Sequence, residues 1–186
     1  SQETQRLKTA LDNVSSGVMV ADTENTVIYL NRSVRRLFGD AEADIRNDMP
    51  GFSAEVLLGD GIDRFHKDPS HQQDLLASLN GTHVSEFELG GHTLRIVANP
   101  VIDDGGERLG TAIEWSDRTA EVDVEREVAE IISAANAGNL EQRILLEGKQ
   151  GFFAQLSNAV NSLLDVTSIA VSEISSVVGS LSKGDL

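Results

Sequence analysis

The distribution of apolar residues divides the chain into two parts with different periodicity. Between residues 15 and 119, apolar positions alternate in short runs bounded by turn-forming residues, which is typical of β-strands. The runs expected to form strands are 17–21, 26–30, 83–89, 92–102 and 108–116. After Thr119 the spacing becomes helical, and Ala, Ser, Val, Leu and Glu predominate. The pattern therefore predicts an α+β domain followed by an all-helical segment.

The N-terminal segment, residues 1–14, has the spacing of a short amphipathic helix. Leu7, Leu11 and Val14 recur at intervals of three or four residues, so we expect a helix over residues 5–14. The chain begins without Met and stops in mid-pattern, as expected of a fragment of a longer protein.

Capping and breaking residues predict further helices between the second and third strands. Asn31 is a suitable N-cap for a helix that we expect to end at Gly39. The stretch 40–65 contains one proline and several glycines, so it is expected to form only short helices. A longer helix follows, capped by Asp68 or Ser70.

An internal repeat is the main feature of the helical segment. Residues 127–140 align with residues 173–186 at an offset of 46, and the residues between 138 and 150 form a polar connector punctuated by glycine. A helix over residues 151–183 is predicted, about 50 Å long at ~1.5 Å rise per residue. Its apolar seam at coiled-coil spacing comprises Leu156, Val160, Leu163, Thr167, Ala170, Ile174, Val177 and Leu181.

Charge and composition exclude several classes of partner and site. Lys and Arg total 15 against 30 for Asp and Glu, a net charge of −15, so nucleic acid and anionic membrane surfaces are unfavourable partners. The absence of cysteine excludes disulfides, thiolate ligands, iron–sulfur clusters and covalently attached c-type heme. No apolar run approaches the ~20 residues that span a bilayer, and no signal-peptide pattern opens the chain. We therefore expect a cytoplasmic location, with no membrane and no nucleic-acid partner.

Four short motifs occur in the order typical of one sensor family. They are Val-Met-Val-Ala-Asp (18–22), Ile-Tyr-Leu-Asn (28–31), Ala-Asn-Pro-Val (98–101) and Glu-Trp-Ser-Asp-Arg-Thr (114–119). With these motifs and the expected strand order, residues 13–119 resemble a PAS domain. The resemblance implies the PAS fold over residues 15–119, a five-stranded antiparallel sheet with helices on one face.

The helical segment resembles the HAMP module of bacterial receptors, in which two helices are joined by a short connector that starts Gly-x-Leu. The resemblance implies one complete HAMP module over residues 120–168 and the start of a second over residues 169–186. We expect a parallel coiled coil and a homodimer through the N-terminal and HAMP helices, because a lone helix would expose its apolar seam to water. The alternative is a plain coiled-coil linker, which the internal repeat disfavours.

The four histidines, His66, His71, His83 and His92, are the candidate metal ligands. His83 and His92 are expected near the surface at strand edges. His66 lies in Phe-His-Lys-Asp-Pro (65–69), where a short rigid turn can fix one ring nitrogen while the other coordinates a metal. A four-ligand zinc site is disfavoured because there is no cysteine. Heme needs less, namely one axial ligand and an apolar pocket.

The motif at His66, followed by His71-Gln72, together with Trp115 on the last strand, resembles the PAS domain of Aer-type soluble chemoreceptors. Those receptors bind b-type heme and respond to oxygen. The resemblance implies that His66 is the axial ligand of heme iron, that Trp115 donates its indole N–H to bound O2, and that Ile96 lines the distal side. Heme b is therefore the expected cofactor, and O2, or alternatively CO or NO, is the expected gas ligand.

Residue chemistry and strand parity agree with these roles. The Trp115 indole is a donor without acceptor capacity, so it favours partly negative oxygen over nearly neutral carbon monoxide. Residues two apart on a strand share a face, so Ile96 and Trp115 can look into one pocket with their neighbours. The further residues expected to line this pocket are Leu57, Leu58, Leu75, Leu76, Leu94 and Ile113. His71 could contact a heme propionate or cap the following helix.

These features predict a heme-based gas sensor and signal relay of a bacterial cytoplasmic chemoreceptor, acting on a downstream chemotaxis signalling region. Ligand binding is expected to draw Trp115 toward the ligand and to shift the last strand. That strand leads through residues 117–119 into a helix near Glu121, so the shift is expected to bias the packing of the HAMP helices. The alternative is a heme-free PAS–HAMP module that binds a small metabolite or only dimerises and relays. A flavin-binding PAS is disfavoured by the single Trp. No catalytic triad, phosphate-binding loop or dinucleotide fingerprint occurs, so no enzyme activity is expected.

Overall fold

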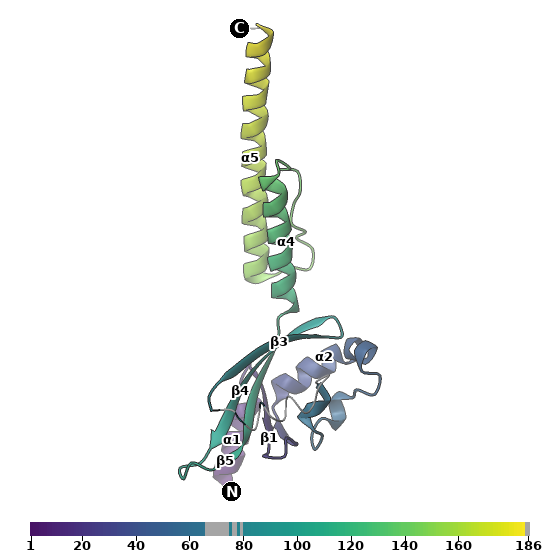
Figure 1. Cartoon of the computed structure of the whole chain (residues 1–186), viewed down its shortest axis with the longest axis vertical. Helices are drawn as coiled ribbons and strands as arrows, with labels where there is room; N and C mark the ends of the chain where they lie inside the picture. The colour runs from purple at the N-terminus through teal and green to yellow at the C-terminus, as the bar shows by residue number, and fades with distance from the viewer. Residues whose placement is uncertain (66–74, 76–77, 79, 185–186) are drawn as a thin grey trace. The chain divides into compact units, whose positions relative to one another are not determined.

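The computed structural model describes residues 1–65, 75, 78 and 80–184. These residues form two compact units, residues 1–119 and residues 120–186 (Figure 1). The boundary falls where the spacing of apolar residues changes from alternating to helical.

The first unit is built on one five-stranded antiparallel sheet. Its strands are β1 (Gly17–Ala21), β2 (Val27–Leu30), β3 (His83–Leu89), β4 (His92–Ile102) and β5 (Arg108–Asp117). The order across the sheet is β2-β1-β5-β4-β3, and every neighbouring pair is antiparallel. All five predicted strands are confirmed to within one residue at each end, because alternating runs bounded by turn residues define strand ends sharply.

Helices of the first unit precede and connect these strands. Those that lie wholly within the described residues are α1 (Gln2–Asp12), α2 (Arg32–Asp48) and two single-turn 3-10 helices, η1 (Ala54–Val56) and η2 (Ile62–Phe65). Figure 1 shows α2 lying against one face of the sheet. The buried residues of α2, spaced four, three and four apart, are Val34, Phe38, Ala41 and Ile45. This stripe packs on the inward residues of the sheet and closes the core.

Helix α2 is longer than predicted, since it continues through Gly39 to Asp48. A glycine inside a helix costs about 1 kcal/mol relative to alanine. Burial of Ala41 and Ile45, both on the stripe that begins before the glycine, outweighs that cost. The helix stops shortly before Pro50, because the residue that precedes a proline disfavours helical backbone.

Asn31 caps α2 as predicted and does more than that. Its side-chain oxygen accepts hydrogen bonds from the backbone N–H groups of Val34 at 3.0 Å and Val18 at 2.9 Å. Its amide donates to the carbonyl oxygens of Leu11 at 3.0 Å and Ser16 at 2.8 Å. Asn31 is fully buried, so these four bonds tie the end of α1, the start of β1 and the start of α2 together.

The second unit consists of two helices and the connector between them. Helix α4 (Thr119–Asn136) begins at the last residue of the first unit, and α5 spans Gly151–Lys183. The predicted helix over residues 151–183 is therefore confirmed. The two helices run side by side in the same direction, and the connector returns between their ends (Figure 1). Gly184 ends α5 in the left-handed conformation that favours glycine, with its N–H bonded to the preceding turn.

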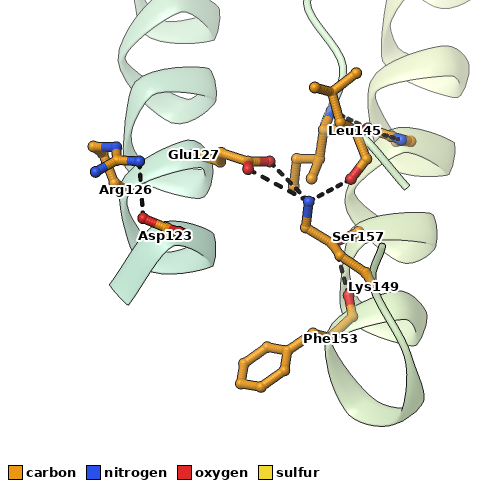
Figure 2. A network of polar contacts seen from close by, with 9 residues as sticks. Asp123, Arg126, Glu127, Leu145, Lys149, Phe153 and Ser157 are labelled. Carbon is orange, nitrogen blue, oxygen red and sulfur yellow. Dashed lines mark hydrogen bonds and ion pairs between the residues drawn. The ribbon is translucent and has the colours of Figure 1, made fainter. Parts of the chain in front are cut away.

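Polar side chains fasten the connector to both helices. The Lys149 ammonium group lies 3.2 Å from a carboxylate oxygen of Glu127 on α4 and also donates to the Leu145 carbonyl oxygen (Figure 2). The Asn161 side chain on α5 accepts from the Ile144 N–H at 2.8 Å and donates to the Ile144 carbonyl oxygen at 2.9 Å. These contacts satisfy the backbone groups of Ile144, whose side chain is buried with residues of both helices.

Helix α5 leaves most of its apolar residues exposed within this single chain. Leu163, Ile174, Val177 and Leu181 of the predicted seam are each more than half exposed. By length and composition α5 could also cross a membrane, although the sequence was expected to contain no such segment.

Candidate functional site

Trp115 lies on β5 at the centre of the sheet, with its side chain in the core. It is paired with Ile96 on β4 and with Gly17 on β1. The side chains of Trp115 and Ile96 share the inward face of the sheet, and both are buried. The structure therefore brings together the two sheet residues expected to line the pocket.

Phenylalanine rings surround the Trp115 indole. The ring centroid of Phe38 on α2 lies 5.0 Å from that of Trp115 and that of Phe65 on η2 lies 5.3 Å away, while Phe87 on β3 is at 6.0 Å. Phe38 and Phe65 also stack on one another at 5.3 Å. Tilted and edge-to-face contacts of this kind add about 0.5–1.5 kcal/mol per pair beyond area burial. They fix the plane of the indole.

The indole N–H of Trp115 has no hydrogen-bond partner among the residues that the structure describes. The side chain is only 4% exposed. Leaving a buried donor unsatisfied costs about 1–3 kcal/mol. A buried donor in an apolar, aromatic setting is well suited to bind a small acceptor.

Most of the other expected pocket residues that the structure describes belong to the same core. Leu57, Leu94 and Ile113 are buried in one cluster with Trp115, and Leu75 is half-buried. Leu58, by contrast, is 50% exposed and does not belong to this buried cluster. The reason is local, since adjacent residues next to a single helical turn point in different directions and Leu57 takes the inward position.

Three predictions fall on residues outside the described part of the chain. They are His66 as the axial ligand, His71 as a propionate contact or helix cap, and Leu76 as a pocket residue. The helix expected to start at Asp68 or Ser70 lies there too, apart from isolated positions. Among the described residues, no group of three or more His, Asp or Glu side chains could hold a metal ion.

The aromatic ring cluster was missed by sequence reasoning. Phe38 follows the helical spacing of α2, which marks it as buried but does not reveal its partner. Phe65 immediately precedes His66 in the motif Phe-His-Lys-Asp-Pro (65–69), and this adjacency is the signal that could have drawn attention to it. Phe87 alternates with polar residues on β3, which predicts its face and not its contact with Trp115.

The sheet order and the helices packed on one face define the PAS fold. Residues 5–69 match the sequence profile of the PAS domain family, and the first unit of the chain is a PAS domain.

The chain is 46% identical over 181 residues to the methyl-accepting chemotaxis protein McpB of Pseudomonas aeruginosa. The alignment covers 97% of this chain, hence both units, but only 27% of that relative. Among solved structures, the Aer2 receptor from Vibrio cholerae, described as a dual PAS-heme oxygen sensor, is 30% identical with a TM-score of 0.52. That similarity covers 55% of this chain and 93% of the solved chain.

Proposed function

We propose that the chain is the oxygen-sensing and signal-relay region of a chemoreceptor, with a histidine-ligated heme b bound in the PAS domain. The observation that carries the proposal is the buried N–H of Trp115 opposite Ile96, which has no hydrogen-bond partner within the described part of the chain. The similarity to a PAS-heme oxygen sensor and to a methyl-accepting chemotaxis protein supports it.

The residues of the core fit such a group. Apolar side chains from both the sheet and the helical layer supply the walls, namely Leu57, Leu94, Ile96 and Ile113. His66, which follows the described residue Phe65, is proposed as the axial ligand from its sequence motif. When bound, heme iron supplies reversible coordination of a diatomic gas.

Trp115 and Ile96 would then both contribute to the discrimination between gas ligands. The indole N–H of Trp115 donates to a gas ligand that carries partial negative charge and gains less from a nearly neutral one. The aliphatic side chain of Ile96 keeps water away from the same space, which strengthens the hydrogen bond in the low-dielectric interior. One such bond contributes about 0.5–1.5 kcal/mol.

The relay would begin at the end of β5. The backbone N–H of Arg118 donates to the Thr93 carbonyl oxygen at 2.7 Å, and α4 starts at the next residue, Thr119. A complete switch between two states requires about 5.5 kcal/mol of differential affinity. One hydrogen bond from Trp115 falls short of that, so the two signalling states must already be nearly balanced, or the pocket must rearrange as a whole.

We further propose that the second unit is a HAMP module that dimerises through a parallel coiled coil in the cytoplasm. The internal repeat, the helix–connector–helix order and the exposed seam of α5 support this proposal. A partner helix would cover the seam.

A second candidate function is a heme-free PAS–HAMP relay. The observation that favours it is the packing of Phe38, Phe65 and Phe87 around Trp115, since a bound macrocycle would have to displace rings from these contacts. In this case the domain would take up a smaller ligand or only dimerise.

Absorption spectroscopy separates the two candidates. Purified chain reconstituted with hemin and then reduced is expected to show a Soret band that shifts under carbon monoxide. His66→Ala is expected to abolish this band, whereas His83→Ala, the matched histidine at the start of β3, retains it. If the wild-type protein takes up no hemin, the heme-free relay is the candidate function that remains.

A further inference from the structure

His92, at the first position of β4, joins two carboxylates from different elements. Its Nδ1 lies 2.7 Å from an oxygen of Asp117, the last residue of β5, and its Nε2 lies 2.8 Å from an oxygen of Asp44 on α2. Sequence reasoning expected an ordinary surface histidine at this strand edge. The structure instead uses it as a bridge between the sheet and the helical layer.

The geometry of this bridge depends on whether the His92 imidazole is protonated on both ring nitrogens. A neutral imidazole has one N–H donor and one acceptor, whereas the imidazolium has two donors. Both ring nitrogens of His92 face carboxylate oxygens, which only accept, so the observed pair of contacts requires the charged form. On loss of the proton, one of the two nitrogens presents a lone pair to a carboxylate, and that contact breaks.

The bridge continues to the first residue of α4. The other oxygen of Asp117 accepts from the Thr119 N–H at 2.9 Å and from the Thr119 hydroxyl. The Thr119 hydroxyl oxygen in turn accepts from the Thr93 N–H at 3.0 Å, beside His92. The charge on His92 therefore bears directly on how Asp117 and Thr119 are held.

The charged groups around His92 favour the imidazolium. On α2, Asp44 touches the ring, Asp48 accepts from the neighbouring Gly90 N–H at 2.7 Å, and Asp40 and Arg36 line the same surface hollow. The end of β5 adds Asp117. Near the ring, the carboxylates of Asp40, Asp44, Asp48 and Asp117 outnumber the guanidinium of Arg36, so these named surroundings attract a positive charge.

We propose that His92 is a proton-operated clamp, which holds the end of β5 and the first residue of α4 against α2 when charged and releases them when neutral. The clamp does not depend on heme. It would make the exit of the PAS domain sensitive to pH in addition to any ligand in the core, because the same residues, Asp117 and Thr119, begin the path into α4.

The direction of the pH effect follows from the two partners. The hydrogen bond to Asp44 is the largest cause that raises the pKa of His92 above 6.5, and burial opposes it. Burial acts to raise the pKa of Asp117, but hydrogen bonds from Thr119 and His92 outweigh burial, so its pKa lies below 3.8. The clamp is therefore complete between pH 3.8 and pH 6.5, the ordinary pKa values of the two groups. It is lost as the pH rises through the raised pKa of His92. Asp117 stays ionised throughout that loss.

Nuclear magnetic resonance of the whole chain tests the clamp, with the His92 ring and the Thr93 and Thr119 amides followed from about pH 5 to about pH 9. We expect all three signals to share one midpoint above 6.5. Asp44→Asn removes the largest cause of the raised pKa of His92, so it is expected to move that midpoint down toward 6.5. Thr93 and Thr119 amides that do not follow the His92 ring would overturn the proposal.

Two variants separate a clamp from a merely structural histidine. His92→Gln is expected to abolish the pH-dependent change of the Thr119 amide, whereas the control His83→Gln retains it. His92→Arg keeps a permanent cation between the carboxylates and is expected to hold the low-pH signal at every pH. A Thr119 amide that still titrates in His92→Arg would contradict the clamp. If His92→Gln does not fold, the Asp44→Asn midpoint still decides.

Discussion

The two units of this chain bury their apolar residues in opposite ways. The PAS domain encloses a continuous core in which Phe38, Phe52 and Leu94 are almost wholly removed from water. In the second unit Ile131, Ile144 and Leu164 form a small buried cluster, while α5 leaves a long apolar seam exposed. A domain that closes its core can fold by itself, whereas the exposed seam of α5 is the feature for which a partner helix is proposed.

The largest expected effect of a single substitution is in the PAS core. Phe38→Ala removes a ring that contacts Trp115, Phe52 and Phe65, and we expect a loss of about 3–5 kcal/mol in the free energy of unfolding. Denaturant unfolding monitored by Trp115 fluorescence measures it. Ile28→Ala, at a position more than half exposed on β2, is the control and should cost far less. Equal losses would mean that the aromatic ring cluster is not the centre of the core.

The next effect tests whether a second copy covers the exposed seam of α5. Ile174→Ala on the seam is expected to weaken self-association by roughly 30-fold, equivalent to about 2 kcal/mol. Sedimentation over a dilution series measures the change. Val171→Ala, on the same helix but off the seam, is the control and should leave self-association unchanged. If both variants weaken association equally, or if neither does, the proposal that a second copy covers the seam is wrong.

A smaller effect is expected where the connector of the second unit is fastened to α5. Asn161→Ala leaves the N–H and carbonyl oxygen of Ile144 without their side-chain partner, which should cost about 1–2 kcal/mol. Hydrogen exchange of the Ile144 amide is expected to accelerate accordingly. Asn158→Ala, at an exposed position of α5, provides the matched control. Unchanged exchange at Ile144 in Asn161→Ala would show that the contact does not hold the connector.

The smallest effect is expected for the ion pair between α4 and the connector. Glu127→Gln removes the charge opposite Lys149, and the loss should be below about 1 kcal/mol and should shrink as salt is added (Figure 2). Thermal unfolding of the second unit at low and high salt measures it. Glu130→Gln, exposed on the same helix, should have no effect on stability. A loss that is independent of salt would contradict an electrostatic origin.

The contrast between the two units also explains what could be predicted from the sequence. The strand ends and the full extent of α5 followed from periodicity, because those patterns are local. The predicted end of α2 at Gly39 was wrong because burial of Ile45 outweighs the helix-breaking tendency of that glycine. Which of Leu57 and Leu58 faces the core depends on a single helical turn, for which the sequence has no period.

Contacts between distant elements were less predictable than the elements themselves. The sequence placed Trp115 and Ile96 on matching faces, since strand parity is a local property. It did not reveal that Phe38 and Phe87 would meet Trp115, nor that His92 would join Asp44 to Asp117. Such pairings depend on how α2 crosses the sheet and on the order of the strands within it, which periodicity does not specify.

The most direct test of the central claim compares gas dissociation in the heme-reconstituted wild type and in Trp115→Leu. If the buried indole N–H donates to the gas ligand, loss of one hydrogen bond should speed oxygen dissociation roughly 2- to 13-fold and leave carbon monoxide dissociation nearly unchanged. Equal changes for the two gases, or no change for oxygen, would contradict the assignment of Trp115 as the residue that recognises oxygen.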